Sequence, residues 1–160
     1  WARFVPVEGD GPAFYHFNLH LDHESQPSRE HSVVLLLDRI GRRAHADPVV
    51  VTGDFNAGEN NRAVRAMVGD LTLADLAPQG GHIERSRVRF VDSFRNLYPG
   101  ESTVGTFNKF RGETGGDKID YIFISPGFEA KAAAIHRERP GGRDLSDHFP
   151  VSATLQLRPH

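Results

Sequence analysis

The sequence predicts an α+β domain in which strands form the core and helices cover it, and three stretches carry this prediction. Apolar and polar residues alternate over residues 13–21, which is typical of a strand with one buried face. Residues 33–40 carry an apolar stripe with helical spacing. Residues 49–51 are a continuous run of valines after a proline, which indicates a strand buried on both faces. The helix followed directly by a buried strand is the crossover pattern of a sheet with helices packed on it.

Composition is consistent with one globular domain and excludes several classes of protein. The chain has 160 residues, 38% of them hydrophobic and 25% charged, and a domain of this size buries roughly 70% of its unfolded surface. The formal net charge of −2 gives no globally basic surface for nucleic acid. There is no cysteine, so disulfides and thiolate sites are excluded. No apolar run approaches the ~20 residues of a membrane span. The composition leaves the cellular compartment unassigned.

The first half of the chain is predicted to form a β-hairpin, a helix and a buried strand. Residues 1–7 and 13–21 flank a turn at 9–12, and we expect them to pair. The helix follows, with Ser28 as the predicted N-cap. Its buried stripe consists of Val33, Leu36, Leu37 and Ile40. The valine strand is expected to break at Gly53, which leaves Asp54 and Asn56 at the point where it reaches the surface. An ordinary turn with Asn56 capping the next segment is the alternative interpretation.

The second half is predicted to contain two short helices and three strands. Asn60 or Asn61 caps the first helix, and Gly69 ends it. Three arginines follow that we expect to form a solvated basic face: Arg85, Arg87 and Arg89. A second amphipathic helix is predicted over residues 91–98. The predicted strands cover residues 118–124, 128–135 and 149–157.

Polar side chains stand beside the ends of four predicted strands, and strand ends converge at one edge of a sheet. They are His20, Asp54 with Asn56, Asp120, and Asp147 with His148. Together they offer the roles that hydrolysis of a phosphate ester needs. His148 can take a proton from water while Asp120 holds its tautomer. Asp147 offers oxygen ligands to a hard cation.

The other polar groups have matching roles. His20 (if protonated) and Asn56 can donate hydrogen bonds to phosphoryl oxygens. Asp54 can orient the attacking water or protonate the leaving group. No serine or cysteine nucleophile and no Gly-rich phosphate loop is indicated, so the residue types favour metal-assisted attack by water. A zinc site is disfavoured, because His16 and His20 on one strand would lie about 13 Å apart at ~3.3 Å per residue. Each histidine alone is also compatible with a partly exposed strand face.

Four stretches in order resemble the endonuclease/exonuclease/phosphatase superfamily, which has the deoxyribonuclease I-like fold. They are Asn18-Leu19-His20-Leu21-Asp22-His23, Gly53-Asp54-Phe55-Asn56, Lys118-Ile119-Asp120-Tyr121-Ile122 and Ser146-Asp147-His148-Phe149-Pro150-Val151. No single stretch is decisive, but the four span most of the chain. The variant that follows His20 resembles a bacterial branch of the superfamily.

The resemblance implies a four-layer α/β sandwich of two mixed β-sheets flanked by helices, of which this chain would be the C-terminal part. It also implies a phosphodiesterase or phosphomonoesterase that uses Mg²⁺ or Mn²⁺. In that case His148 is the base held by Asp120, and Asp147 is a metal ligand. Asp54 and Asn56 act on the water, the leaving group and the phosphate, and His20 binds the phosphate.

The chain departs from the superfamily pattern at its N-terminal side. Members begin with a strand that ends in asparagine and carry a later glutamate, the principal metal ligand, and this chain has neither. Trp1 corresponds to about the middle of the pattern, so we expect a missing N-terminal part, or a second chain, to complete the site. The expected partner is a phosphate ester: nucleic acid, a nucleotide or a lipid head group.

Two other functional classes compete with the hydrolase. The first is a catalytically inactive binding or assembly domain on the same fold, in which the absent glutamate is a true loss. If the gene encodes, upstream of Trp1, a strand with an asparagine and then a glutamate, the enzyme is favoured over this class. The second is an α/β nucleotide-binding fold built on residues 49–56, which is disfavoured because no glycine fingerprint follows that strand.

Overall fold

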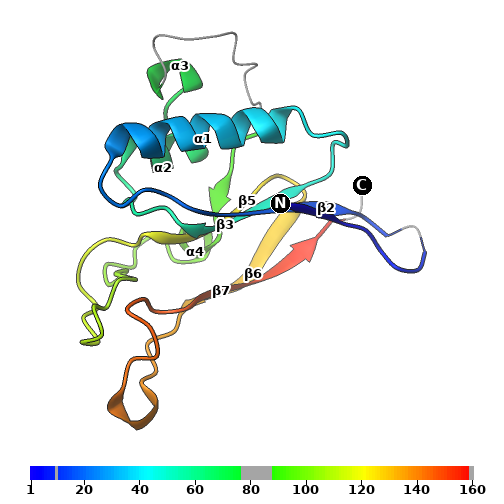
Figure 1. Cartoon of the computed structure of the whole chain (residues 1–160). Helices are drawn as coiled ribbons and strands as arrows, with labels where there is room; N and C mark the ends of the chain where they lie inside the picture. The colour runs from blue at the N-terminus through cyan, green and yellow to red at the C-terminus, as the bar shows by residue number, and fades with distance from the viewer. Residues whose placement is uncertain (10, 77–87, 159–160) are drawn as a thin grey trace.

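The protein folds into two β-sheets packed face to face, with helices covering the outer face of the larger sheet (Figure 1). The computed structural model describes residues 1–9, 11–76 and 88–158. Helices α1 (Gln26–Gly41), α2 (Arg62–Met67) and α3 (Leu73–Leu76) lie on one side of the larger sheet, and the smaller sheet lies on the other. The predicted α+β class is confirmed. Among the described residues, no helix is long and apolar enough to cross a membrane.

The larger sheet has five strands in the order β1-β2-β3-β5-β4. Strands β2 and β3 are parallel and joined by the crossover helix α1, whereas the other pairs are antiparallel, so this sheet is mixed as predicted. The predicted N-terminal hairpin is β1 paired with β2. The strand bounds are β1 Ala2–Phe4, β2 Phe14–His20, β3 Val49–Asp54, β4 Val91–Asp92 and β5 Asp120–Ile124.

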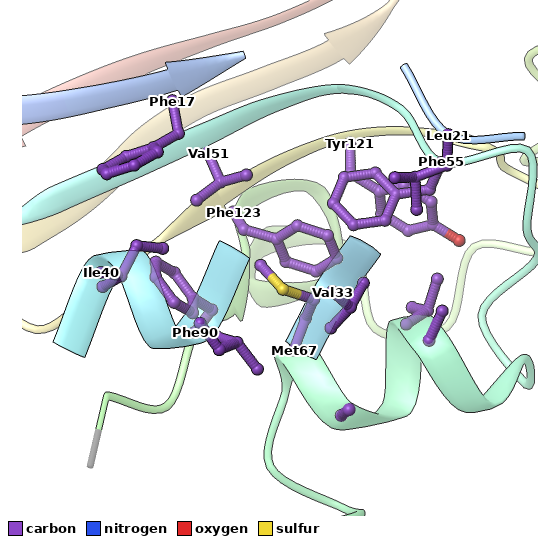
Figure 2. Close-up of a cluster of buried hydrophobic side chains, with 14 of the residues drawn as sticks. Phe17, Leu21, Val33, Ile40, Val51, Phe55, Met67, Phe90, Tyr121 and Phe123 are labelled. Carbon is purple, nitrogen blue, oxygen red and sulfur yellow. The ribbon is translucent and has the colours of Figure 1, made fainter. Parts of the chain in front are cut away.

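The main hydrophobic core lies between this sheet and helices α1 and α2 (Figure 2). Val33, Leu37 and Ile40 of α1 are buried there, as the stripe predicts. The sheet contributes alternate residues, among them Val51 of β3 and Phe123 of β5. Because side chains alternate along a strand, the residues between them face the second sheet. Asp54 and Asp120 belong to that second set.

The smaller sheet is the antiparallel pair β6 (Phe128–Ile135) and β7 (Val151–Leu157). It packs on the other face of the larger sheet through a small cluster centred on Val50, Ile124 and Ala130. Helix α4 (Ser93–Leu97) adds Leu97 to this cluster, and a single 3₁₀ turn, Pro140–Gly142, lies between the two strands. Among the described residues β6 and β7 pair only with each other, so the mixed pairing is a property of the larger sheet.

Helix α1 begins three residues earlier than the sequence predicts. Its N-cap is Ser25, whose hydroxyl accepts a hydrogen bond from the Ser28 N–H at 3.2 Å. Ser28 therefore lies inside the first turn, and its prediction as the cap is wrong. Pro27 explains the difference, because proline has no N–H to satisfy and its fixed φ suits the first helical turn. In α2 the cap is Asn61, one of the two predicted residues.

Strand β3 does not break at Gly53 as predicted but continues to Asp54. Gly53 has φ +140°, and a Cβ atom there would lie 1.9 Å from the Leu19 carbonyl oxygen of the neighbouring strand. Only glycine permits this close approach. Gly53 therefore lies inside β3 and allows it to pair closely with β2, and it does not end the strand. The consequence for the site is direct, because Asp54 stays in register with its neighbours on both sides.

The predicted helix over residues 91–98 is in part a strand. Val91 and Asp92 form the two-residue strand β4 against β5, and only then does α4 begin. Asp92 ends the strand because its carboxylate accepts the Phe94 N–H at 3.0 Å and caps the helix. Of the predicted basic face, Arg85 and Arg87 lie outside the described residues.

Candidate active site

Strand register places three of the predicted site residues in one row across the larger sheet. His20 of β2 is the Cα partner of Asp54 of β3, and Asp54 is the Cα partner of Asp120 of β5. Neighbouring strands lie about 4.8 Å apart, so the three side chains emerge side by side on the face that looks toward the second sheet. The row is thus a direct product of the pairing that Gly53 preserves.

His148 reaches this row from the other sheet. It lies just before β7, and its Nδ1 is 2.8 Å from Asp120 Oδ2. Its Nε2 lies 3.9 Å from Asp54 Oδ2. An ionised Asp120 accepts a hydrogen bond, so it holds the ring proton on Nδ1 and leaves Nε2 with a free lone pair. His148 keeps 25% of its side-chain surface exposed, so this nitrogen is accessible from solvent.

Asp54 is held in place by Asn56. The Asn56 N–H donates to Asp54 Oδ1 at 2.7 Å, and its side-chain Nδ2 donates to Asp54 Oδ2 at 3.2 Å and to the Leu21 carbonyl at 2.9 Å. Asn56 has φ +46°, a conformation that asparagine tolerates in tight turns. Both Nδ2 protons are engaged, so in this conformation Asn56 orients Asp54 and has no free amide proton for a ligand.

The environment moves the pKa values of two of these groups upward. Burial disfavours the charged imidazole, but the hydrogen bond with Asp120 and the surrounding carboxylate charges outweigh it, so the pKa of His148 lies above its ordinary value of 6.5. Burial raises the pKa of Asp54 above 3.8; the Asn56 N–H opposes this shift, and the charge of Asp120 adds to it. The site therefore holds a base and an acid whose proton affinities are both increased.

His20, at one end of the row, and Asp147, next to His148, complete the set of predicted residues. His20 is 73% exposed in its side chain, and its Nε2 is 3.3 Å from Asp54 Oδ2. Asp147 is half-buried beside His148, and its negative charge contributes to the raised pKa of that histidine. Its backbone carbonyl accepts hydrogen bonds from the N–H groups of Asn108 and Lys109.

One group among the described residues has the spacing to share a metal ion. It consists of Asp54, Asp120 and His148, whose ligand atoms all lie within 4.8 Å of one another. Asp147 is not part of this group. Neither are His16 and His23, the other histidines near His20 in the sequence: His16 bonds the Thr52 hydroxyl at 2.8 Å, and His23 pairs with Glu24.

Phe107 adjoins the site, although no pattern in the sequence singles it out as a site residue. Its ring centroid lies 5.2 Å from that of His148, and the two residues form an isolated antiparallel bridge. Phe107 is 38% exposed, so an aromatic surface stands open next to the histidine. The sequence carries no signal for this contact, because only the fold brings Phe107 to His148.

The chain that carries this row of residues matches a known protein family. The chain matches the profile of the Endonuclease/Exonuclease/phosphatase family over residues 2–148, a range that includes His20, Asp54, Asp120 and His148. The chain belongs to that family. The resemblance carried by the four sequence motifs is confirmed. No curated protein sequence matches the chain at a significant level.

This chain spans about half the length of the solved structures that it matches. A mannosyl-6-phosphatase from Bacteroides thetaiotaomicron is 27% identical with a TM-score of 0.65; the alignment covers 91% of this chain and 51% of that one. A family protein from the same species is 28% identical with a TM-score of 0.66, and the coverages are 90% and 50%. D. rerio TDP2 complexed with a single-strand DNA product is similar in fold at 21% identity, with a TM-score of 0.62 and coverages of 92% and 58%.

Proposed function

We propose that the protein carrying this chain hydrolyses phosphate esters by activating a water molecule at His148, with Mg²⁺ or Mn²⁺ as cofactor. The observation that carries the proposal is the 2.8 Å contact between His148 Nδ1 and Asp120, with the other ring nitrogen turned toward Asp54. A histidine held in one tautomer by a carboxylate, and open to solvent on its second nitrogen, is the arrangement that general-base catalysis requires. Membership of the family supports the same chemistry.

In the proposed reaction His148 Nε2 accepts a proton from water as the water oxygen attacks phosphorus. Asp120 stays ionised and stabilises the imidazolium that forms. The bond from phosphorus to the leaving oxygen breaks, and that oxygen receives a proton from Asp54. The raised pKa of Asp54 suits this role, because a carboxyl group that retains its proton more strongly is available as an acid closer to neutral pH.

His20 and Asn56 assist at the phosphate in this proposal. His20 is the exposed member of the row, so its ring can donate to a phosphoryl oxygen that lies over Asp54. Asn56 acts through Asp54 in the observed conformation, and it would donate to phosphate only by releasing one of its present acceptors.

The described residues supply some, but not all, of the ligands that a hard divalent cation needs. Mg²⁺ uses one or two carboxylates together with waters and substrate phosphate, and Asp147 is a half-buried carboxylate next to His148. We propose that Asp147 holds the ion. Asp120 is committed to His148, and an imidazole nitrogen is not a preferred ligand of Mg²⁺. A bound ion would neutralise negative charge on the phosphate during attack. The remaining ligands are proposed to come from a part of the protein that precedes Trp1, or from a second chain.

The test is hydrolysis of bis-p-nitrophenyl phosphate and p-nitrophenyl phosphate by the full-length gene product and by this chain alone. The monoester is included because one structural relative is a mannosyl-6-phosphatase. We expect activity that EDTA abolishes and Mg²⁺ or Mn²⁺ restores, and a roughly 100-fold lower rate in His148→Ala. A matched control is His136→Ala, which removes a histidine bonded to Ser152 on the second sheet.

The outcomes separate the hydrolase from its competitor. Activity in the full-length protein alone would place the missing ligands outside this chain. Equal rates in His148→Ala and wild type would contradict the proposed base. Absence of both hydrolysis and metal binding in the full-length protein would favour the binding or assembly domain on the same fold.

A further inference from the structure

Asp120 lies in the larger sheet and His148 lies in the loop that leads into the smaller one, yet their side chains meet at 2.8 Å. Asp120 begins β5 of the larger sheet, and His148 precedes β7 of the smaller one. The two sheets pack mainly through apolar side chains, which are not directional. A hydrogen bond of defined length across such an interface needs a rigid connection near the two residues.

A third segment, residues 105–108, makes that connection. Thr106 has no exposed surface, and its hydroxyl oxygen accepts hydrogen bonds from the N–H groups of Ile119 at 3.0 Å and Asp120 at 3.2 Å. Its carbonyl accepts the Phe149 N–H at 2.7 Å. One buried residue therefore bonds the backbone at Asp120 and the backbone immediately after His148.

Asn108 secures the same segment from the other side of His148. It is 1% exposed, and its N–H donates to the Asp147 carbonyl at 2.7 Å while its Nδ2 donates to the Ser146 carbonyl at 3.1 Å. Its side-chain oxygen accepts the Phe110 N–H at 2.8 Å. The backbone on both sides of His148 is thus fixed to residues 106–108. Figure 1 shows the loop that precedes β5 beside the loop that joins β6 to β7.

We propose that Thr106 and Asn108 are positioning residues that align His148 with Asp120. This inference rests on the proposed hydrolysis at His148. Neither residue contacts the reacting atoms. Thr106 fixes Asp120, Asn108 fixes the approach to His148, and the Phe107–His148 bridge joins the two anchors. Small displacements of a base strongly reduce catalysis, so removal of either anchor is expected to lower kcat more than it raises KM.

The matched variants are Thr106→Val, which keeps the shape and removes the hydroxyl, and Thr106→Ser, which keeps the hydroxyl. Thr154→Val, on an exposed position of β7, is the control for the substitution itself. The direct readout is the ¹⁵N imidazole spectrum of His148, assigned by its loss in His148→Ala. This spectrum shows which ring nitrogen carries the proton and does not depend on turnover.

In wild type, Thr106→Ser and Thr154→Val we expect the neutral ring to carry its proton on Nδ1. In Thr106→Val we expect a mixture of tautomers and a roughly 10- to 100-fold lower kcat with KM little changed. A single Nδ1–H tautomer in Thr106→Val would overturn the inference, even if the variant were less stable to heat. If Thr106→Val does not fold, Asn108→Ala decides by the same spectrum. If wild type does not hydrolyse either ester, the proposed function fails while the tautomer spectrum still tests the alignment.

Discussion

Two clusters of charged side chains flank the start of strand β5, and they differ in how completely their charges are compensated. Lys118 and Asp92 form a buried ion pair at 2.6 Å, and the lysine also lies 3.4 Å from the centroid of the Tyr121 ring. Two residues further on, Asp120 joins Asp54 and His148 in a half-buried group with two carboxylates and one histidine. The first cluster is balanced and closed, whereas the second carries excess negative charge and is open to solvent.

This difference in charge compensation indicates a structural role for the first cluster and a chemical role for the second. The side chains of Lys118 and Asp92 are 1% and 8% exposed, so neither charge is open to a ligand from solvent, and Asp92 also caps α4. The open group leaves the Nε2 atom of His148 and the raised proton affinity of Asp54 available. We therefore propose that the carboxylates near this strand serve different purposes, Asp92 a structural one and Asp54 and Asp120 a chemical one.

The largest expected effect comes from breaking the closed pair. Lys118→Met removes the cation and leaves Asp92 buried without its partner, so the free energy of unfolding should fall by roughly 3–5 kcal/mol. Urea or thermal unfolding measures this loss. Lys118→Met combined with Asp92→Asn should recover much of it, because the amide keeps the helix cap without a buried charge. If Lys118→Met were as stable as wild type, the description of Lys118 and Asp92 as a buried, compensated ion pair would be contradicted.

Breaking the open group should have the opposite signature. Asp54→Asn is expected to reduce hydrolysis roughly 100-fold while leaving the protein as stable as wild type or slightly more stable. The sign follows from the raised pKa of Asp54. Its protonated form is favoured by folding, and this contribution is lost as pH rises through the folded-state pKa, so at neutral pH the ionised group opposes folding. A large loss of stability at pH 7 would place Asp54 among the architectural residues.

The smallest expected effect is a shift in pH dependence. The pKa of His148 is raised, and the proposed reaction needs His148 neutral while Asp54 still carries its proton. Hydrolysis should therefore follow a bell-shaped pH profile in which the limb set by His148 has its midpoint above 6.5. Asp120→Asn should move that midpoint to lower pH. Protonation of His148 stabilises the fold. This contribution is complete below the pKa of His148 in the unfolded state, and it is lost as pH rises through the pKa in the folded state. Thermal melts of wild type and His148→Ala should therefore converge as pH rises through this window.

The open group was largely predictable from the sequence, and the closed one was not. His20, Asp54 and Asp120 each stand at a strand end of one sheet, so their convergence could be expected from strand pairing. His148 precedes a strand of the other sheet, so strand pairing within one sheet does not place it there. The family resemblance added the order of the motifs. Lys118 and Asp92 are 26 positions apart, and Asp92 ends a strand of only two residues, so no periodic pattern indicates that they pair.

Local geometry was predicted less well than the placement of elements. A glycine after a valine run indicates a break, yet Gly53 is needed inside the strand because the Leu19 carbonyl approaches it too closely for a Cβ atom. Thr106 and Asn108 appear as ordinary loop residues until the fold brings residues 117–120 and 146–149 to them. Contacts of this kind depend on pairing between distant segments, which neither propensity nor spacing encodes.

The measurement that tests the central claim most directly is a double-mutant cycle on hydrolysis of bis-p-nitrophenyl phosphate by the full-length protein. It compares wild type, Asp120→Asn, His148→Ala and the double variant. If the two residues act as one unit, each single variant should lose roughly 100-fold and the double variant should lose no more than the worse single one. Losses that multiply to roughly 10,000-fold would show that Asp120 and His148 act independently, and would contradict a base that works only together with its carboxylate.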